Sequence, residues 1–122
     1  MSSDSARTRL FRPAVAAGGL VFVSGQASVG RDGAVLADSF EGEMRRALAN
    51  LDRVLGDAGL GLDDVVQVRA YVDEAASLPV YNRIYLEHFR EPLPARTTLI
   101  GCLGGVVRFE IEAVAAQRGT ET

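Results

Sequence analysis

The strongest constraint on the fold is an apolar stripe with helical spacing between residues 40 and 55. Its members recur at intervals of three or four residues and are Phe40, Met44, Leu48, Leu51 and Leu55. This spacing places them on one face of a helix. Asp38 followed by Glu41 resembles a capping box at its start, and Gly59 is a suitable stop. The helix should therefore lie on a sheet or another helix, with an opposite, solvated face that carries Glu41, Arg45, Asn50 and Arg53.

Residues on both sides of this helix show the patterns of strands. The run Leu20–Ser24 is typical of a short buried strand that ends at Gly25. Turn residues between 27 and 37 predict a small hairpin. Residues 65–72 alternate between apolar and polar side chains, which predicts a strand with one wet or partner-facing side.

A second helix and two strands are expected in the last third of the chain. The helix is predicted from Leu78 to Phe89, with Ser77 as N-cap and a proline in the first turn, where its missing N–H costs nothing. Strands are predicted at 97–103 and 106–116, and the Gly104-Gly105 pair favours a tight hairpin turn between them.

The order of these elements predicts an α+β fold in which two helices pack on one face of a mixed β-sheet. A length of 122 residues and a hydrophobic content of 48% suit one domain with an ordinary core. We expect a single domain over residues 1–122, with its core at about 9–117 and loose, flexible tails at both ends.

Composition excludes several kinds of chemistry. All 13 basic residues are arginine, so there is no lysine for a phosphate-binding loop, a Schiff base or a pyridoxal cofactor. One histidine and one cysteine cannot form a Cys/His metal cluster or an internal disulfide within one chain. A net charge of −3 and a pI near 5.1 argue against charge-driven nucleic-acid binding. Because a signal-peptide core and a membrane-spanning apolar run are both missing, we expect a cytoplasmic protein.

Charged residues on the last two strands are candidates for a site. Glu110 and Glu112 share the polar face of the last strand with Arg108, which on spacing alone is typical of a solvated surface. Arg96 opens the preceding strand, where it is either a surface charge or a bidentate donor to a carboxylate. The residue pattern by itself leaves both alternatives open.

Four segments occur in the order GLVFVSGQ (19–26), YNRIYLEHF (81–89), PARTT (94–98) and FEIEAVA (109–115). Together they resemble the signature segments of the Rid (YjgF) family of reactive-intermediate deaminases, over almost the whole chain. The resemblance implies a chorismate-mutase-like fold, assembled as a homotrimer with clefts between subunits. It also implies cofactor-independent hydrolysis of small 2-enamine and 2-imine carboxylates, such as 2-aminoacrylate, to 2-oxo acids and ammonia.

The resemblance extends to individual residues. Arg96 matches the arginine that binds the substrate carboxylate, and Glu110 matches the carboxylate that positions or activates water. The implied substrate-binding residues are Phe11, Ser24, Gly25, Asn82 and Thr98. No metal or organic cofactor is implied.

The chain also departs from the family pattern. Thr98 stands where many active members have cysteine, Phe11 replaces a frequent tyrosine, and Gly104-Gly105 replaces a Leu-Pro turn about one residue longer. We expect Cys102 to be a small packing residue and His88 to be structural.

Alternative functions are a specialised pathway deaminase with an aminomuconate-like or biosynthetic substrate, and a trimer that binds small carboxylates without turnover. The acidic charge disfavours a ribonuclease. A two- or four-residue hairpin turn would place Arg96 and Glu110 on opposite faces of the sheet, so that they could share a cleft only from different subunits. An odd-numbered loop or a bulge would place them on the same face. We expect the two residues to belong to different protomers of one cleft.

Overall fold

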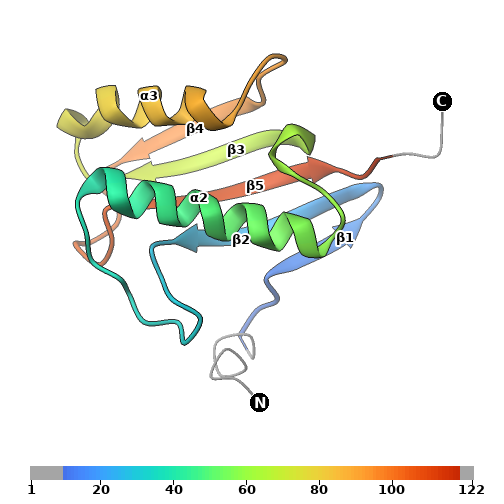
Figure 1. The fold of residues 1–122 in the computed structure, drawn as a ribbon, viewed down its shortest axis with the longest axis horizontal. Coiled ribbons are helices and arrows are strands. Elements are labelled where there is room, and N and C mark those ends of the chain that lie inside the picture. The colour runs from blue at the N-terminus through green and yellow to red at the C-terminus, as the bar shows by residue number, and fades with distance from the viewer. Residues whose placement is uncertain (1–9, 119–122) are drawn as a thin grey trace.

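The computed structural model describes residues 10–118. One mixed sheet carries two α-helices on the same face, and the apolar core lies between these layers (Figure 1). The elements in chain order are β1 (Ala14–Ala17), β2 (Leu20–Ala27), α2 (Phe40–Asp57), β3 (Val65–Val72), α3 (Leu78–His88), β4 (Ala95–Ile100) and β5 (Phe109–Ala116), with short 3-10 turns at Leu62–Asp64 and Ala75–Ser77. The α+β fold, with two helices on one face of a mixed sheet, is confirmed.

Strand order in the sheet is β1-β2-β5-β3-β4. The β3–β4 pair is parallel and the other pairs are antiparallel. Since parallel neighbours need a crossover connection, α3 supplies it between β3 and β4. The strand predicted at 65–72 is confirmed with those bounds, and β2 runs three residues beyond the predicted end at Ser24.

The predicted hairpin between the last two strands is wrong. Strand β4 ends at Ile100 and pairs only with β3, while β5 begins at Phe109 on the other side of β3. The connecting residues pass the end of β3, where Gly101 donates a backbone hydrogen bond to Val72 and Asp73 donates one to Arg108. The Gly104-Gly105 pair has φ of 65° and 77° and makes a turn, but local turn chemistry does not determine which strands pair.

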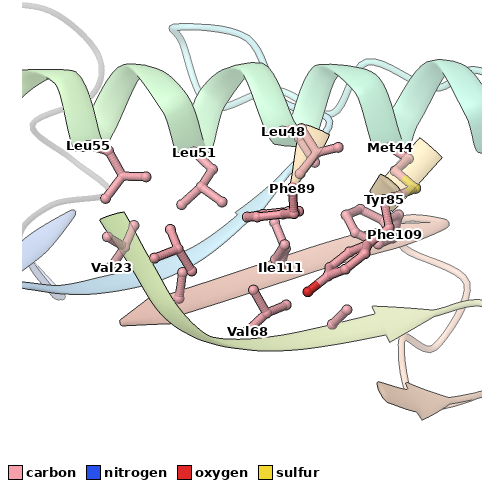
Figure 2. Close-up of a cluster of buried hydrophobic side chains, with 14 of the residues drawn as sticks. Val23, Met44, Leu48, Leu51, Leu55, Val68, Tyr85, Phe89, Phe109 and Ile111 are labelled. Carbon is pink, nitrogen blue, oxygen red and sulfur yellow. The ribbon is translucent and has the colours of Figure 1, made fainter. Parts of the chain in front are cut away.

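The core is formed by the predicted stripe of α2 against the inner face of the sheet, as Figure 2 shows. Met44, Leu48, Leu51 and Leu55 are at most 1% exposed. From the sheet they meet Val23, Val68 and Ile111, while Phe40 packs edge-to-face on Phe109 with ring centroids 5.9 Å apart. The helical periodicity therefore identified the buried face correctly.

Two details of α2 differ from the sequence prediction. The N-cap is Ser39, whose hydroxyl accepts from the Gly42 N–H, so the capping box of Asp38 and Glu41 does not form. Asn50 is 7% exposed instead of solvated, because its amide donates to the carbonyls of Ala27 and Val29. The helix stops after Asp57, and Gly59 follows with φ +78° as expected.

The hairpin expected at 27–37 exists only in minimal form. A single antiparallel bridge joins Val29 and Val35, and Gly33 donates to the Gly30 carbonyl in the turn between them. Asn50 fixes this loop to α2 through the two carbonyls it binds. The loop is thereby held beside the end of β2.

Candidate functional site

Arg96 lies on β4 and projects toward the helices. Its Cζ atom is 4.8 Å from the centroid of the Tyr81 ring and 4.7 Å from that of Tyr85, both on α3. These distances are within the range of cation–π contacts. The two tyrosines are four residues apart, so helix geometry places both rings on the side that faces β4.

The Arg96 pocket is a shallow cavity of about 280 Å³ between α3 and the start of β4. Its walls are formed by Asn82, Tyr85, Leu86, Leu93, Pro94 and Arg96. Within residues 10–118, Arg96 forms no ion pair with a carboxylate. Its side chain therefore presents a positive charge and N–H donors that can receive an anionic group.

Glu110 lies in a second cavity, the Glu110 pocket, of about 600 Å³. Phe11, Gly25, Cys102, Val106 and Glu110 are among the residues that line it. Glycine at position 25 leaves room for the Glu110 carboxylate, because a Cβ atom there would overlap Oε2 and displace it. The backbone of β2 and the Glu110 carboxylate are thus in direct contact.

Ser24 supports the Glu110 pocket without lining it. Its hydroxyl donates to the Arg12 carbonyl at 2.7 Å, and its backbone N–H donates to the Pro13 carbonyl. Both bonds fix the segment that carries Phe11 against β2. Phe11 remains 46% exposed at the wall of the pocket, so its ring is available to a ligand.

Arg96 and Glu110 project from opposite faces of the sheet. Arg96 shares a row with Val68 and, through it, with Ala113 on the core face. Glu110 is three residues from Ala113, and side chains alternate between faces with period two. Glu110 therefore points away from the helices, between the fully buried Phe109 and Ile111. The opposite placement expected from the sequence holds, although it arises from the β5-β3-β4 order and not from a hairpin.

Glu112, on the same face as Glu110, has partners within the sheet. The Tyr71 hydroxyl donates to its carboxylate at 2.8 Å, and Arg69 lies 3.5 Å from its other oxygen. This hydrogen bond is the main cause of the raised pKa of Tyr71. Glu112 is thus a structural carboxylate. Glu110 differs from it because Glu110 lines a cavity.

The remaining candidate residues have mixed outcomes. Asn82 is exposed in the Arg96 pocket, as a binding residue should be. The Thr98 hydroxyl lies 2.8 Å from that of Tyr81. The expectation that Cys102 is a packing residue is wrong, because its thiol is exposed and lines the Glu110 pocket. His88 lies at the end of α3, with Nδ1 2.9 Å from the Ile84 carbonyl, which agrees with a structural role.

Tyr81 and Tyr85 are site residues that the sequence reasoning missed. They are 0% and 4% exposed, and burial raises the pKa of both hydroxyls, so both stay protonated at neutral pH. Their spacing of four on the helix next to the PARTT segment was the available signal. It is ambiguous in a sequence, since buried aromatic residues at this spacing usually form only core.

Residues 10–118 contain no cluster of three or more histidine, cysteine or acidic side chains that could hold a metal ion. In the same part of the chain no helix has the length and apolar character needed to cross a bilayer.

Comparison with known proteins agrees with this architecture. The profile of a family described as Endoribonuclease L-PSP matches residues 3–117. Protein mmf2, mitochondrial, of Schizosaccharomyces pombe is 34% identical over 113 residues, which are 88% of this chain and 87% of that protein. Reactive Intermediate Deaminase A, chloroplastic, of Arabidopsis thaliana is 29% identical over 107 residues, 86% of this chain and 57% of that protein. The crystal structure of RidA from an Antarctic Psychrobacter superposes with a TM-score of 0.80 at 25% identity and covers 87% of both chains.

Fold and candidate site together define a small α+β protein in which Arg96 and Glu110 project from opposite faces of one sheet and each lines a cavity. The match over nearly the whole length makes the family plain. The chain belongs to the Rid (YjgF) family, the family whose profile is described as Endoribonuclease L-PSP.

Proposed function

We propose that this protein is a cofactor-independent deaminase that hydrolyses small 2-enamine and 2-imine carboxylates to 2-oxo acids and ammonia. The observation that carries the proposal is Arg96, which lies on two tyrosine rings, lines a cavity and forms no ion pair within residues 10–118. A planar guanidinium in this state binds a carboxylate through two parallel hydrogen bonds. The plant relative named Reactive Intermediate Deaminase A supports the same class of activity.

In the proposed reaction, Arg96 binds the carboxylate of the substrate. A proton from solvent adds to the terminal carbon of the enamine and gives the protonated imine (iminium). Water then adds to the carbon of the C=N bond, while Glu110 accepts a proton from the water. Glu110 returns that proton to the nitrogen of the carbinolamine; as the C–N bond breaks, the hydroxyl proton passes to the departing ammonia and the C=O bond forms, so the products are the 2-oxo acid and ammonium. Positioned water and a general base of this kind contribute about 10²–10⁴-fold.

We place the reaction in a cleft between subunits of a homotrimer. One chain presents Arg96 and Glu110 on opposite faces of its sheet, so a single ligand reaches both only when they come from different copies. The outer face of the sheet also exposes Phe22 and Leu99 by 45% and 37%. An interface that joins two different surfaces is head-to-tail, and a closed ring satisfies every such surface. Three subunits in the ring is the assembly that the family resemblance implies.

The first test is a coupled assay in which a pyridoxal enzyme generates 2-aminoacrylate and the appearance of pyruvate is followed. We expect the wild type to exceed the uncatalysed rate. Arg96→Ala should lose about 10- to 150-fold in kcat/KM, because a hydrogen bond to a charged group contributes about 1.5–3 kcal/mol. Arg90→Ala is the matched control, because Arg90 is exposed, pairs with Asp63 and lines neither pocket. Absence of acceleration by folded, assembled wild type would overturn the deaminase.

A second test addresses the shared cleft. Arg96→Ala and Glu110→Gln are each expected to be strongly impaired, and subunits of the two variants are refolded together in equal amounts. Each mixed trimer then has one cleft with both native residues, so about a quarter of the wild-type activity should return. A site contained within one chain predicts no recovery.

Two other functions make different predictions. A trimer that only binds carboxylates would be stabilised by pyruvate, by about 2.7 kcal/mol at one hundred times the Kd, without any turnover. The family description favours an endoribonuclease as a second candidate. A net charge of −3 gives a polyanion little attraction to this chain, so we expect no cleavage when it is incubated with single-stranded RNA.

A further inference from the structure

We infer that Tyr81 and Tyr85 are positioning residues that hold the Arg96 guanidinium ready for a carboxylate, and that Thr98 fixes Tyr81 for this task. The inference rests on the proposed function for its ligand class. It assigns the two tyrosines and the Thr98 hydroxyl an indirect role, through Arg96. Arg96 itself makes the contact with the ligand.

The two rings restrict what Arg96 can do. An arginine side chain loses about 2 kcal/mol of rotamer entropy when it is fixed, and a ligand that orders it bears this cost. Here the Cζ atom lies 4.8 and 4.7 Å from two ring centroids before any ligand arrives. The two ring centroids are only 6.1 Å apart, so both rings contact the guanidinium from one side. Arg96 also lines the pocket, where its N–H donors can bind a planar carboxylate.

The tyrosines are themselves immobile. Tyr81 is 0% exposed and its ring centroid lies 6.0 Å from that of Phe109, while Tyr85 stacks on Phe89 at 4.7 Å. The hydroxyl of Tyr81 is held by that of Thr98, on the same strand and the same face as Arg96. Tyr81 and Tyr85, which we call the tyrosine clamp, therefore connect the core to the Arg96 guanidinium through buried contacts.

Substitutions of Tyr85 can test the contribution of its ring separately from that of its hydroxyl. It is buried, and it has no hydrogen-bond partner within residues 10–118. An unpartnered buried hydroxyl is destabilising. Phenylalanine at this position keeps the ring face and removes the hydroxyl, whereas leucine removes both. The pair Tyr85→Phe and Tyr85→Leu thus isolates the contribution of the ring to Arg96.

The test measures ligand affinity and arginine order in the assembled full-length protein. Pyruvate is titrated calorimetrically, and KM and kcat are measured with 2-aminoacrylate. Tyr85→Leu and Tyr81→Leu should raise the Kd and KM about 2- to 30-fold, the range of a cation–π contact, and change kcat less. Tyr85→Phe should have the Kd and KM of the wild type. Ile84→Ala, a fully buried change on the same helix, controls for lost stability.

Thr98 is tested by a cycle with Tyr81. Thr98→Val and Tyr81→Phe each remove the same hydroxyl–hydroxyl bond, so the double variant should raise KM no more than either single variant does. Thr98→Ser should behave as wild type. Additive effects would show that the two hydroxyls act separately and would overturn the role of Thr98.

The Nε–Hε proton of Arg96 provides a readout that needs no turnover. Because Arg96 lies over two aromatic rings, this NMR signal should be shifted upfield, and the double variant Tyr81→Leu with Tyr85→Leu should return it toward the free-arginine position. If that shift and the pyruvate Kd are both unchanged in the leucine variants, the inference is overturned. If the Nε–Hε chemical shift responds as expected but the wild type neither binds pyruvate nor turns over enamine, the proposed function fails. The contact of the two tyrosines with Arg96 would then still be supported.

Discussion

Glu43 is a buried carboxylate that connects the start of α2 to the strand carrying Glu110. It is 2% exposed, and each of its oxygens accepts a different backbone N–H. Oε1 accepts from Arg108 at 2.9 Å and Oε2 accepts from Asp38 at 3.1 Å. The Arg108 side chain completes the arrangement by donating to the Asp38 carbonyl. We predict that Glu43→Gln destabilises the protein although it keeps the shape of the side chain.

The magnitude follows from the two acceptors. A glutamine offers one oxygen, so it satisfies one N–H and turns its own NH₂ donor toward the other. A hydrogen bond to a charged group contributes about 1.5–3 kcal/mol, and Glu43→Gln should cost that amount in the free energy of unfolding. Glu43→Ala leaves both N–H groups unpaired and should cost about 3–6 kcal/mol. Against a typical total of about 5–15 kcal/mol, the alanine variant approaches the limit of folding.

Urea unfolding at one protein concentration measures this effect, with the midpoint compared at equal slope m. Glu41→Gln is the matched control on the same helix. Its carboxylate is 45% exposed and pairs with Arg45 and Arg83 on the surface, so the change should cost less than about 1 kcal/mol. If Glu43→Gln is no more destabilising than Glu41→Gln, the reasoning about two directed acceptors is refuted.

Acid stability and site geometry yield two more predictions. The hydrogen bond from Arg118, helped by the Gly61 N–H, lowers the pKa of Asp64 in the folded state. Its stabilising contribution is therefore present above the ordinary aspartate pKa of about 3.9 and is lost as the pH falls through the lower folded-state value. Asp64→Asn should be less stable than wild type at pH 7, and its free energy of unfolding should fall less steeply below pH ~4. Urea titrations at each pH measure this. The control is Asp52→Asn, which removes the same charge at an exposed position; the same dependence of stability on pH in both variants would contradict the prediction. Gly25→Ala should fold but displace the Glu110 carboxylate, and we expect kcat for 2-aminoacrylate to fall at least tenfold if Glu110 is worth the usual ~10²–10⁴ of a general base; unchanged kcat would exclude a role for that contact.

Local sequence patterns identified most of the secondary structure and the buried faces. The stripe from Phe40 to Leu55 and the alternation at 65–72 depend on periods of 3.6 and 2 that any half-buried helix or strand must show. Errors arose where a polar side chain had a tertiary partner. Asn50 has the sequence signature of a solvated residue, and it is buried because two carbonyls of a distant loop need its amide.

The candidate site was identified in outline but not in its arrangement. Resemblance to a family indicated Arg96 and Glu110, and the structure placed each in its own pocket. The tyrosines beneath Arg96 were missed because their contact depends on the parallel pairing of β3 and β4, which brings β4 under α3. Cys102 was misjudged for a similar reason, since its exposure follows from the loop that crosses the end of β3.

What the sequence determined by itself is therefore local: the presence of the two helices and of most strands, which face of each is apolar, and which charges stand on the last two strands. The tertiary structure alone decided that β5 lies between β2 and β3 and that β4 is an edge strand. The physical reason is that strand pairing is formed by backbone hydrogen bonds, which are chemically alike in every strand and carry no local signal of the partner. The faces of Arg96 and Glu110 depend on that pairing order, so their opposite placement, which the sequence analysis expected from a hairpin, results from the β5-β3-β4 order of the folded sheet.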